Sequence, residues 1–151
     1  MIKSNFLRNQ HLIRARYKIE EIDFFDTNWH SRRISQEELK QIDIVLAADV
    51  VYNAEITRAF FQVLQYLLIN VEHDSCKAGL EVFISLEKRL WTDADGHANA
   101  PSYNLFLECI DDLKANHPEI RIQNVPINFP HIYKDFYDRV SNLVLWRIHT
   151  R

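Results

Sequence analysis

Acidic and aromatic side chains occur together at three places in this sequence. The three groups are Asp23-Phe24-Phe25-Asp26, Asp49-Val50-Val51-Tyr52, and Glu87-Lys88-Arg89 with Trp91 close behind. Each group follows or ends a stretch that we expect to form a strand. In an open α/β sheet, ligands bind outside the carboxyl ends of the strands, so these groups are the candidates for a functional site.

Asp49 is the most informative of these residues because it comes directly after the apolar run of residues 42–48. A carboxylate in that position needs a partner, since burying an unpaired charge is costly. It is either satisfied by the amides of the next helix or directed into a site. Tyr52 follows in the turn before that helix, so its ring and the carboxylate can lie close together. For Glu87-Lys88-Arg89, the alternative is an ordinary solvated run of charges.

Strands and helices that alternate along the chain must position these groups. Short apolar patterns predict strands over residues 17–24, 42–48, 80–86, 121–125 and 142–148. Helical spacing of apolar residues predicts helices over residues 5–15, around residue 37, from residue 53 to residue 71, and over residues 102–116. Asn53 is expected to cap its helix, with Glu55 placed favourably in the first turn.

This alternation predicts an α/β fold with a largely parallel sheet. No helix separates the last two predicted strands, so we expect that pair to run antiparallel. The 151 residues are about the length of one domain and are enough to bury a sizeable core. Because no linker or repeat interrupts them, we assign residues 1–151 to a single domain.

The composition excludes several classes of protein. The two glycines, Gly79 and Gly96, lie too far apart to form a G-x-G-x-x-G loop or a P-loop. The net charge of -3 predicts no broad basic surface for duplex nucleic acid. Cys76 and Cys109 are too few for a disulfide framework and are expected to be free thiols. The seven histidines lack metal-ligand spacing, so no metal is expected. No apolar run approaches the ~20 residues of a membrane span.

The residues around Asp49 resemble a known family. The segment Leu46-Ala47-Ala48-Asp49-Val50-Val51-Tyr52 is similar to the Asp-x-x-Tyr motif of methyltransferase family 16, whose members use S-adenosylmethionine and often modify lysines on proteins. Ile22-Asp23-Phe24 resembles the family's Leu-Asp-Trp element, with Phe24 in place of its tryptophan. Residues 84–90 and 143–148 also resemble the family, so the likeness runs over about residues 9–148.

The resemblance implies a Rossmann-like, seven-strand methyltransferase fold that is incomplete in this chain. The family's glycine-rich cofactor loop and its ribose-binding acid have no counterpart here. We therefore expect residues 1–151 to be the C-terminal part of a single methyltransferase domain, lacking strands 1 and 2. The sheet is then parallel with an antiparallel last strand, and residues 42–48 form an edge instead of a central strand.

The same resemblance implies roles for six residues. On the cofactor side, Phe24 stacks near the adenine of S-adenosylmethionine with Asp23 beside it, and the small Ala48 lies under the cofactor. On the substrate side, Asp49 and Tyr52 line the channel for the lysine amine, where a carboxylate oxygen orients the amine and helps its deprotonation. Glu87 adds a second negative charge, which attracts a cationic lysine.

The function that follows is protein-lysine N-methylation, with a protein as partner and with no direct contact to nucleic acid or membrane. Two alternatives stay open. One is a non-catalytic, truncated methyltransferase-like module that binds a partner. The other is a methyltransferase for small molecules or nucleic acids, although no Asn-Pro-Pro-Tyr-like element stands at residues 49–52. The resemblance implies an intracellular protein, nuclear or cytoplasmic.

Overall fold

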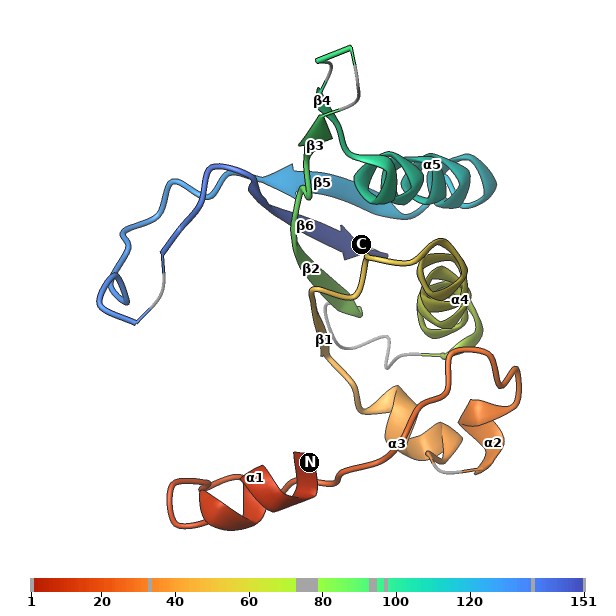
Figure 1. The fold of residues 1–151 in the computed structure, drawn as a ribbon. Helices are drawn as coiled ribbons and strands as arrows, with labels where there is room; N and C mark the ends of the chain where they lie inside the picture. The colour runs from red at the N-terminus through yellow and green to blue at the C-terminus, as the bar shows by residue number, and fades with distance from the viewer. Residues whose placement is uncertain are drawn as a thin grey trace.

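A four-stranded sheet forms the centre of the molecule (Figure 1). The computed structural model describes residues 2–32, 34–72, 79–92, 95–96, 98–136 and 138–150. Within them the sheet has the order β1-β2-β6-β5 and consists of β1 (Ile44–Ala48), β2 (Glu81–Glu87), β6 (Leu143–His149) and β5 (Arg121–Val125). β1 and β2 are parallel, and β6 is antiparallel to β2 and β5. The predicted α/β class and the antiparallel last strand are confirmed.

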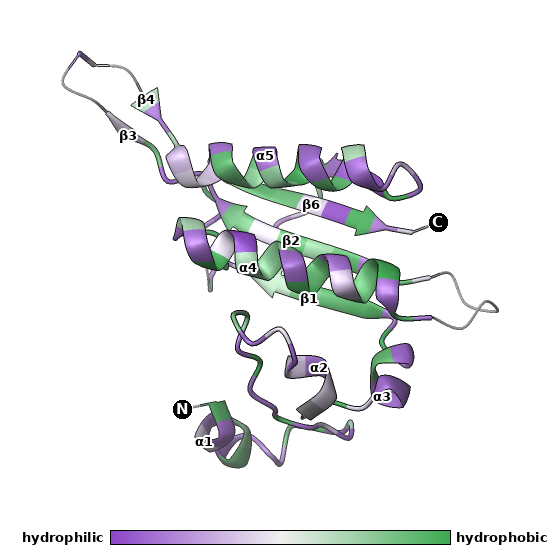
Figure 2. Ribbon diagram, turned by 90° about the vertical axis from the view of Figure 1, so that its right-hand side faces the viewer, coloured by the Kyte–Doolittle hydropathy of each residue, from purple (hydrophilic) through white to green (hydrophobic). Residues whose placement is uncertain are grey.

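Two long helices lie on one face of this sheet (Figure 2). They are α4 (Ala54–Gln65), with its π-helical continuation η1 (Tyr66–Asn70), and α5 (Pro101–Asn116). α4 begins as predicted, because the Asn53 side chain accepts hydrogen bonds from the N–H groups of Glu55 and Ile56 at 2.9 and 3.2 Å. These bonds satisfy two of the free donors at the helix start.

The hydrophobic core lies between the two helices and the sheet. Val82, Ile84 and Leu86 alternate along β2 and are fully buried, as are Phe106 of α5 and Ile148 of β6. This alternation is typical of a strand with one face against the core. No helix among the described residues is long and apolar enough to cross a membrane.

β1 occupies an edge of the sheet, and its burial differs from the prediction made from its residues alone. Its short, continuous apolar run is typical of a strand covered on both faces, yet Ile44 is 56% exposed and Leu46 is 78% exposed. The reason is that α4 and α5 cover one face of the sheet, and Ile44 and Leu46 alternate with Val45 and Ala47 and point to the other face (Figure 2). β1 also pairs with β2 on one side and, among the described residues, with no strand on the other. An apolar strand of the central type therefore stands at an edge, as the resemblance implies.

The N-terminal part forms short helices instead of a strand. They are α1 (Ile2–Arg8), α2 (Trp29–Arg32) and α3 (Gln36–Lys40). α3 confirms the helix predicted around residue 37, while the helix predicted over residues 5–15 ends at Arg8. The strand predicted over residues 17–24 is wrong, because the structure has no strand there.

Side-chain contacts hold the segment that contains residues 17–24. The Tyr17 ring packs against Phe6 of α1 with 4.7 Å between ring centroids. The Lys18 ammonium donates a hydrogen bond to Glu38 of α3 at 2.8 Å. An extended segment becomes a strand only where a neighbouring strand pairs with its backbone, and here the neighbours are helices.

Two connections complete the fold. Residues 91–101, which lie outside the predicted helices and strands, include a short hairpin of β3 (Trp91–Thr92) and β4 (Ala98–Asn99). The long connection between β5 and β6 extends away from the sheet (Figure 1). It leaves β5 and enters β6 at the same edge of the sheet where β2 ends.

Candidate functional site at the carboxyl edge of the sheet

The strand directions bring two of the three predicted groups to one edge. β1 and β2 run in parallel, with Ala48 paired with Ser85, so Asp49 and the residues after Glu87 leave the sheet side by side. Glu87 also pairs with Leu143, the first residue of β6. This edge is the one at which ligands bind in open α/β sheets.

Asp49 sits in an unusual backbone conformation at this edge. Its φ is +52°, and among the described non-glycine residues it alone has a positive φ. Its N–H donates a hydrogen bond to the Ser85 carbonyl at 2.9 Å, which extends the β1–β2 ladder by one residue. Left-handed conformations cost energy for residues other than glycine, and strain of this kind concentrates at functional sites.

The Asp49 carboxylate is paired with Arg89 and does not cap the next helix. Nη2 of Arg89 donates to Oδ2 of Asp49 at 2.8 Å and to Oδ1 at 3.0 Å. The capping position of α4 is filled by Asn53. Both members of the pair are more than half exposed, at 59% for the Asp49 side chain and 56% for the Arg89 side chain. The carboxylate therefore faces solvent at the edge of the sheet.

Sequence reasoning placed Arg89 in a candidate group but gave it no role and did not predict its contact with Asp49. Its neighbours are not a plain solvated run of charges either, because the Lys88 ammonium lies over the Tyr103 ring at 4.8 Å from the centroid. The Lys88 N–H also donates to the Asn142 carbonyl at 2.9 Å. Arg89 and Asp49 are 40 positions apart in the sequence, so no local pattern could have joined them.

Tyr52 and Glu87, predicted for the substrate side, lie at the same edge, as does Ala48, predicted for the cofactor side. Tyr52 is in the turn before α4, its side chain is about half exposed, and its carbonyl accepts a hydrogen bond from the Ser102 hydroxyl at 3.5 Å. Ala48 and Glu87 are exposed at the ends of β1 and β2. The closeness of the Tyr52 ring to the Asp49 carboxylate stays a prediction.

Phe24 and Asp23 lie in the segment that packs against α4. The Phe24 ring is half-buried and contacts Phe60 of α4, with 5.6 Å between centroids. Oδ1 of Asp23 accepts a hydrogen bond from the Phe25 N–H at 3.0 Å, which forms a local turn. Phe24 therefore has a clear packing role, and its contact with an adenine ring stays a prediction.

The hollow beside Phe24 is small for a nucleoside cofactor. It has a volume of about 150 Å³ and is lined by Phe24, Asp26, Thr27, Trp29, Gln62, Val63 and Tyr66. Pockets that bind small molecules usually have volumes of roughly 300–1,000 Å³. No side chain that lines this hollow is a cation that could hold the carboxylate of S-adenosylmethionine. The hollow therefore does not fit the whole cofactor.

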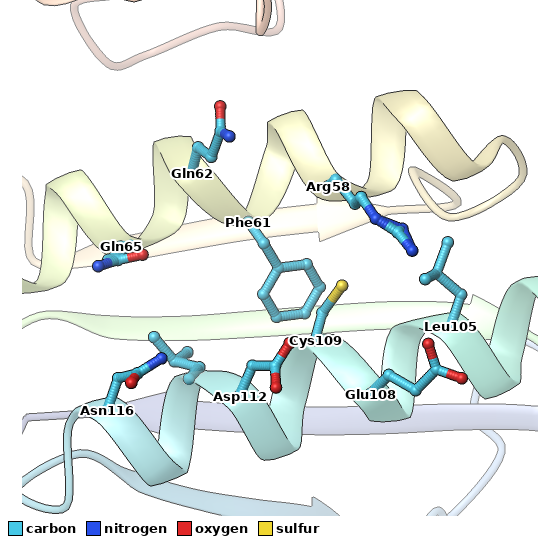
Figure 3. Close-up of a pocket in the computed structure, with 10 residues that line it drawn as sticks. Arg58, Phe61, Gln62, Gln65, Leu105, Glu108, Cys109, Asp112 and Asn116 are labelled. Carbon is cyan, nitrogen blue, oxygen red and sulfur yellow. The ribbon is translucent and has the colours of Figure 1, made fainter.

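A larger groove lies elsewhere, between α4 and α5 (Figure 3). Its volume is about 330 Å³, and its walls include Arg58 and Phe61 of α4 and Cys109 and Asp112 of α5. Cys109 is a free thiol, as predicted, and partial burial raises its pKa; Cys76 lies outside the described residues. None of the predicted site residues lines this groove.

The fold and the edge site define an α/β protein with exposed acidic and basic groups at the carboxyl ends of parallel strands. Residues 1–99 match the family model described as lysine methyltransferase, so the chain belongs to that family. The matched residues include all six predicted site residues and Arg89. No curated protein matches the chain.

Proposed function

We propose that this protein is an S-adenosylmethionine-dependent protein-lysine N-methyltransferase. The observation that carries the proposal is the Asp49 carboxylate, held at the carboxyl edge of the sheet in a left-handed turn and exposed to solvent. Membership of the lysine methyltransferase family supports the same reaction. An exposed carboxylate attracts cationic side chains, of which lysine is one.

The chain's own residues would handle the lysine side of the reaction. Asp49 binds the ammonium of the substrate and takes its proton at a carboxylate oxygen, which leaves a neutral amine with a free lone pair. The exposed Tyr52 ring forms a wall beside the amine, and Glu87 draws the cation toward the edge. When bound, S-adenosylmethionine would supply a methyl group on a sulfonium. The main contribution of the protein's residues is then to position the neutral amine.

We also propose that residues 1–151 form the C-terminal part of a single seven-strand methyltransferase domain. The order of elements and the exposed apolar residues Ile44 and Leu46 on the edge strand support it. We further propose a relation to methyltransferase-like protein 22, which residues 84–90 and 143–148 resemble. From this likeness we further propose an intracellular location, nuclear or cytoplasmic.

A non-catalytic binding module is the second candidate. The small hollow at Phe24 favours it, because the described residues there do not fit the whole cofactor. The gene upstream of Met1 separates the two candidates. A continuous reading frame that encodes a strand followed by Gly-x-Gly supports the enzyme, and its absence supports the module.

The decisive experiment is methyl transfer by the product of the complete reading frame. The protein is incubated with radiolabelled S-adenosylmethionine and a demethylated protein extract, and label in methyl-lysine is measured. We expect transfer by the wild type and a loss of about 100-fold or more in Asp49→Asn. Asp112→Asn, in α5 beside a groove that none of the predicted site residues lines, is the matched control and should retain activity. Absence of methyl-lysine with the wild type would reject the enzyme.

A further inference from the structure

Arg89 holds the Asp49 carboxylate in an arrangement that resembles an ammonium contact. A single nitrogen, Nη2, contacts both carboxylate oxygens at 2.8 and 3.0 Å. Arginine more often places two nitrogens against two carboxylate oxygens in parallel. One donor nitrogen centred between two oxygens is the contact that a lysine ammonium, a compact point charge, also makes.

The backbone next to Arg89 is held in place, while the Arg89 guanidinium is free to change its position. The preceding residue is tied to the start of β6 through the Lys88 N–H and to α5 through the Lys88 ammonium over the Tyr103 ring. The Arg89 side chain itself is 56% exposed. An ion pair this exposed contributes little stability, so a competing cation can replace the guanidinium.

We propose that Arg89 occupies the place of the substrate ammonium on Asp49 and is displaced when a lysine binds. This inference rests on the proposed function and adds a substrate class to it. The displaced guanidinium keeps its charge and lies within one side-chain length of the bound lysine. The favoured substrates are therefore lysines that have an aspartate or glutamate beside them, because that carboxylate receives Arg89.

The displacement is tested without catalysis by binding of n-butylammonium, a mimic of the lysine side chain. Chemical shifts of the Asp49 and Arg89 amides are followed by NMR during titration of the product of the complete reading frame, with n-butanol as the neutral control ligand. We expect Arg89→Gln to bind n-butylammonium about fivefold more tightly than the wild type, the ratio that corresponds to an exposed ion pair of ~1 kcal/mol. Asp49→Asn should abolish the binding.

Two further variants separate displacement from a general change of charge. Lys114→Gln removes one positive charge from the last turn of α5, outside the candidate site, and should bind n-butylammonium as the wild type does. Arg89→Lys keeps a competing cation and should also match the wild type. Equal affinities for the wild type and Arg89→Gln, or an equal gain in Lys114→Gln, would overturn the proposal. Retained backbone spectra confirm that each variant is folded.

The substrate class is tested with two peptides that differ in one residue. One carries lysine followed by aspartate, and the other carries lysine followed by alanine. The wild type should bind the acidic peptide about fivefold more tightly than the alanine peptide, and Arg89→Gln should lose this preference. A preference that survives in Arg89→Gln contradicts the role of Arg89. These binding measurements do not depend on methyl transfer. A negative binding result is therefore distinguishable from failure of the proposed enzyme activity.

Discussion

Asp49 combines a charged side chain with a backbone conformation that few residues tolerate. Its φ of +52° lies in the left-handed region, where asparagine, aspartate and glycine are accommodated better than alanine. Position 49 thus requires a residue that tolerates a positive φ as well as a carboxylate. An alanine variant changes the charge and the backbone energy together, so loss of function in Asp49→Ala alone is ambiguous.

The backbone contribution of position 49 can be measured separately. Asp49→Asn and Asp49→Ala both remove the ion pair with Arg89, and they differ in their tolerance of positive φ. We expect Asp49→Ala to have a free energy of unfolding about 1 kcal/mol lower than that of Asp49→Asn, measured by urea denaturation. Asp49→Gly should be at least as stable as Asp49→Ala. Equal stability of the alanine and asparagine variants would show that the turn carries no strain.

Contacts in the folded structure lower the pKa of Glu38. The hydrogen bond from Lys18 is the largest cause that lowers its pKa from 4.5 to about 2, and hydrogen bonds from Ser35 add to it. A carboxyl whose pKa is lowered by folding stabilises the fold above its unfolded pKa. That contribution disappears as the pH falls from about 4.5 toward 2.

NMR titration of the Glu38 side chain tests this shift. The wild type should titrate well below 4.5, and Lys18→Gln should raise the pKa toward the ordinary value because the main hydrogen-bond donor is gone. Lys40→Gln is the control, since Lys40 pairs with Glu37 on the same helix at 3.2 Å. An unshifted Glu38 pKa in the wild type would mean that the contact between residue 18 and α3 does not form.

At the scale of elements, the sequence predicted those helix and strand boundaries that depend on residues close together in the chain. β5 was predicted with its observed bounds, and α4 begins at its Asn53 cap, because apolar spacing and capping chemistry lie within a few residues. The strand expected over residues 17–24 failed because a strand also needs a paired neighbour. The pairing of Asp49 with Arg89 was missed for a similar reason, since only the sheet brings residues 40 positions apart together.

The connection between β5 and β6 depends on one arginine. Nη1 of Arg139 donates to the carbonyls of Ile127 and Phe129 at 3.3 and 2.6 Å, and its guanidinium lies 4.4 Å from the Phe129 ring centroid. The aromatic and aliphatic side chains around it are exposed, with Phe136 at 85% and Ile132 at 74%. Arg139 therefore organises a connection that has little core of its own.

Arg139→Ala should loosen this connection without unfolding the sheet. Charged hydrogen bonds contribute about 1.5–3 kcal/mol each, so we expect limited chymotrypsin digestion after the exposed aromatic residues to accelerate at least about tenfold. The midpoint of global unfolding should change little. Lys134→Ala, in the same connection, is the control and should be cleaved at the wild-type rate. Unchanged cleavage of Arg139→Ala would show that the connection is ordered by other contacts.

At the scale of the whole molecule, the edge position of β1 matters most. Its backbone is paired with β2 on one side, and no strand among the described residues pairs with the other side. Ile44 and Leu46 add exposed apolar surface on that strand. Long, apolar, unpaired edges are templates for strands of other chains, so this edge is where the molecule is expected to associate.

The 151-residue chain on its own should therefore self-associate and bind S-adenosylmethionine negligibly. Leu46→Lys places a charge on the exposed edge and should shift the chain toward monomer in sedimentation velocity. Ile132→Lys makes the same change at a side chain of similar exposure, 74% against 78%, in the distant connection and should leave association unchanged. Weak cofactor binding is expected because the hollow beside Phe24 is only about 150 Å³. A wild-type chain that is monomeric and binds the cofactor with micromolar affinity, measured by calorimetry, would contradict both expectations and would mean that these residues form a complete site.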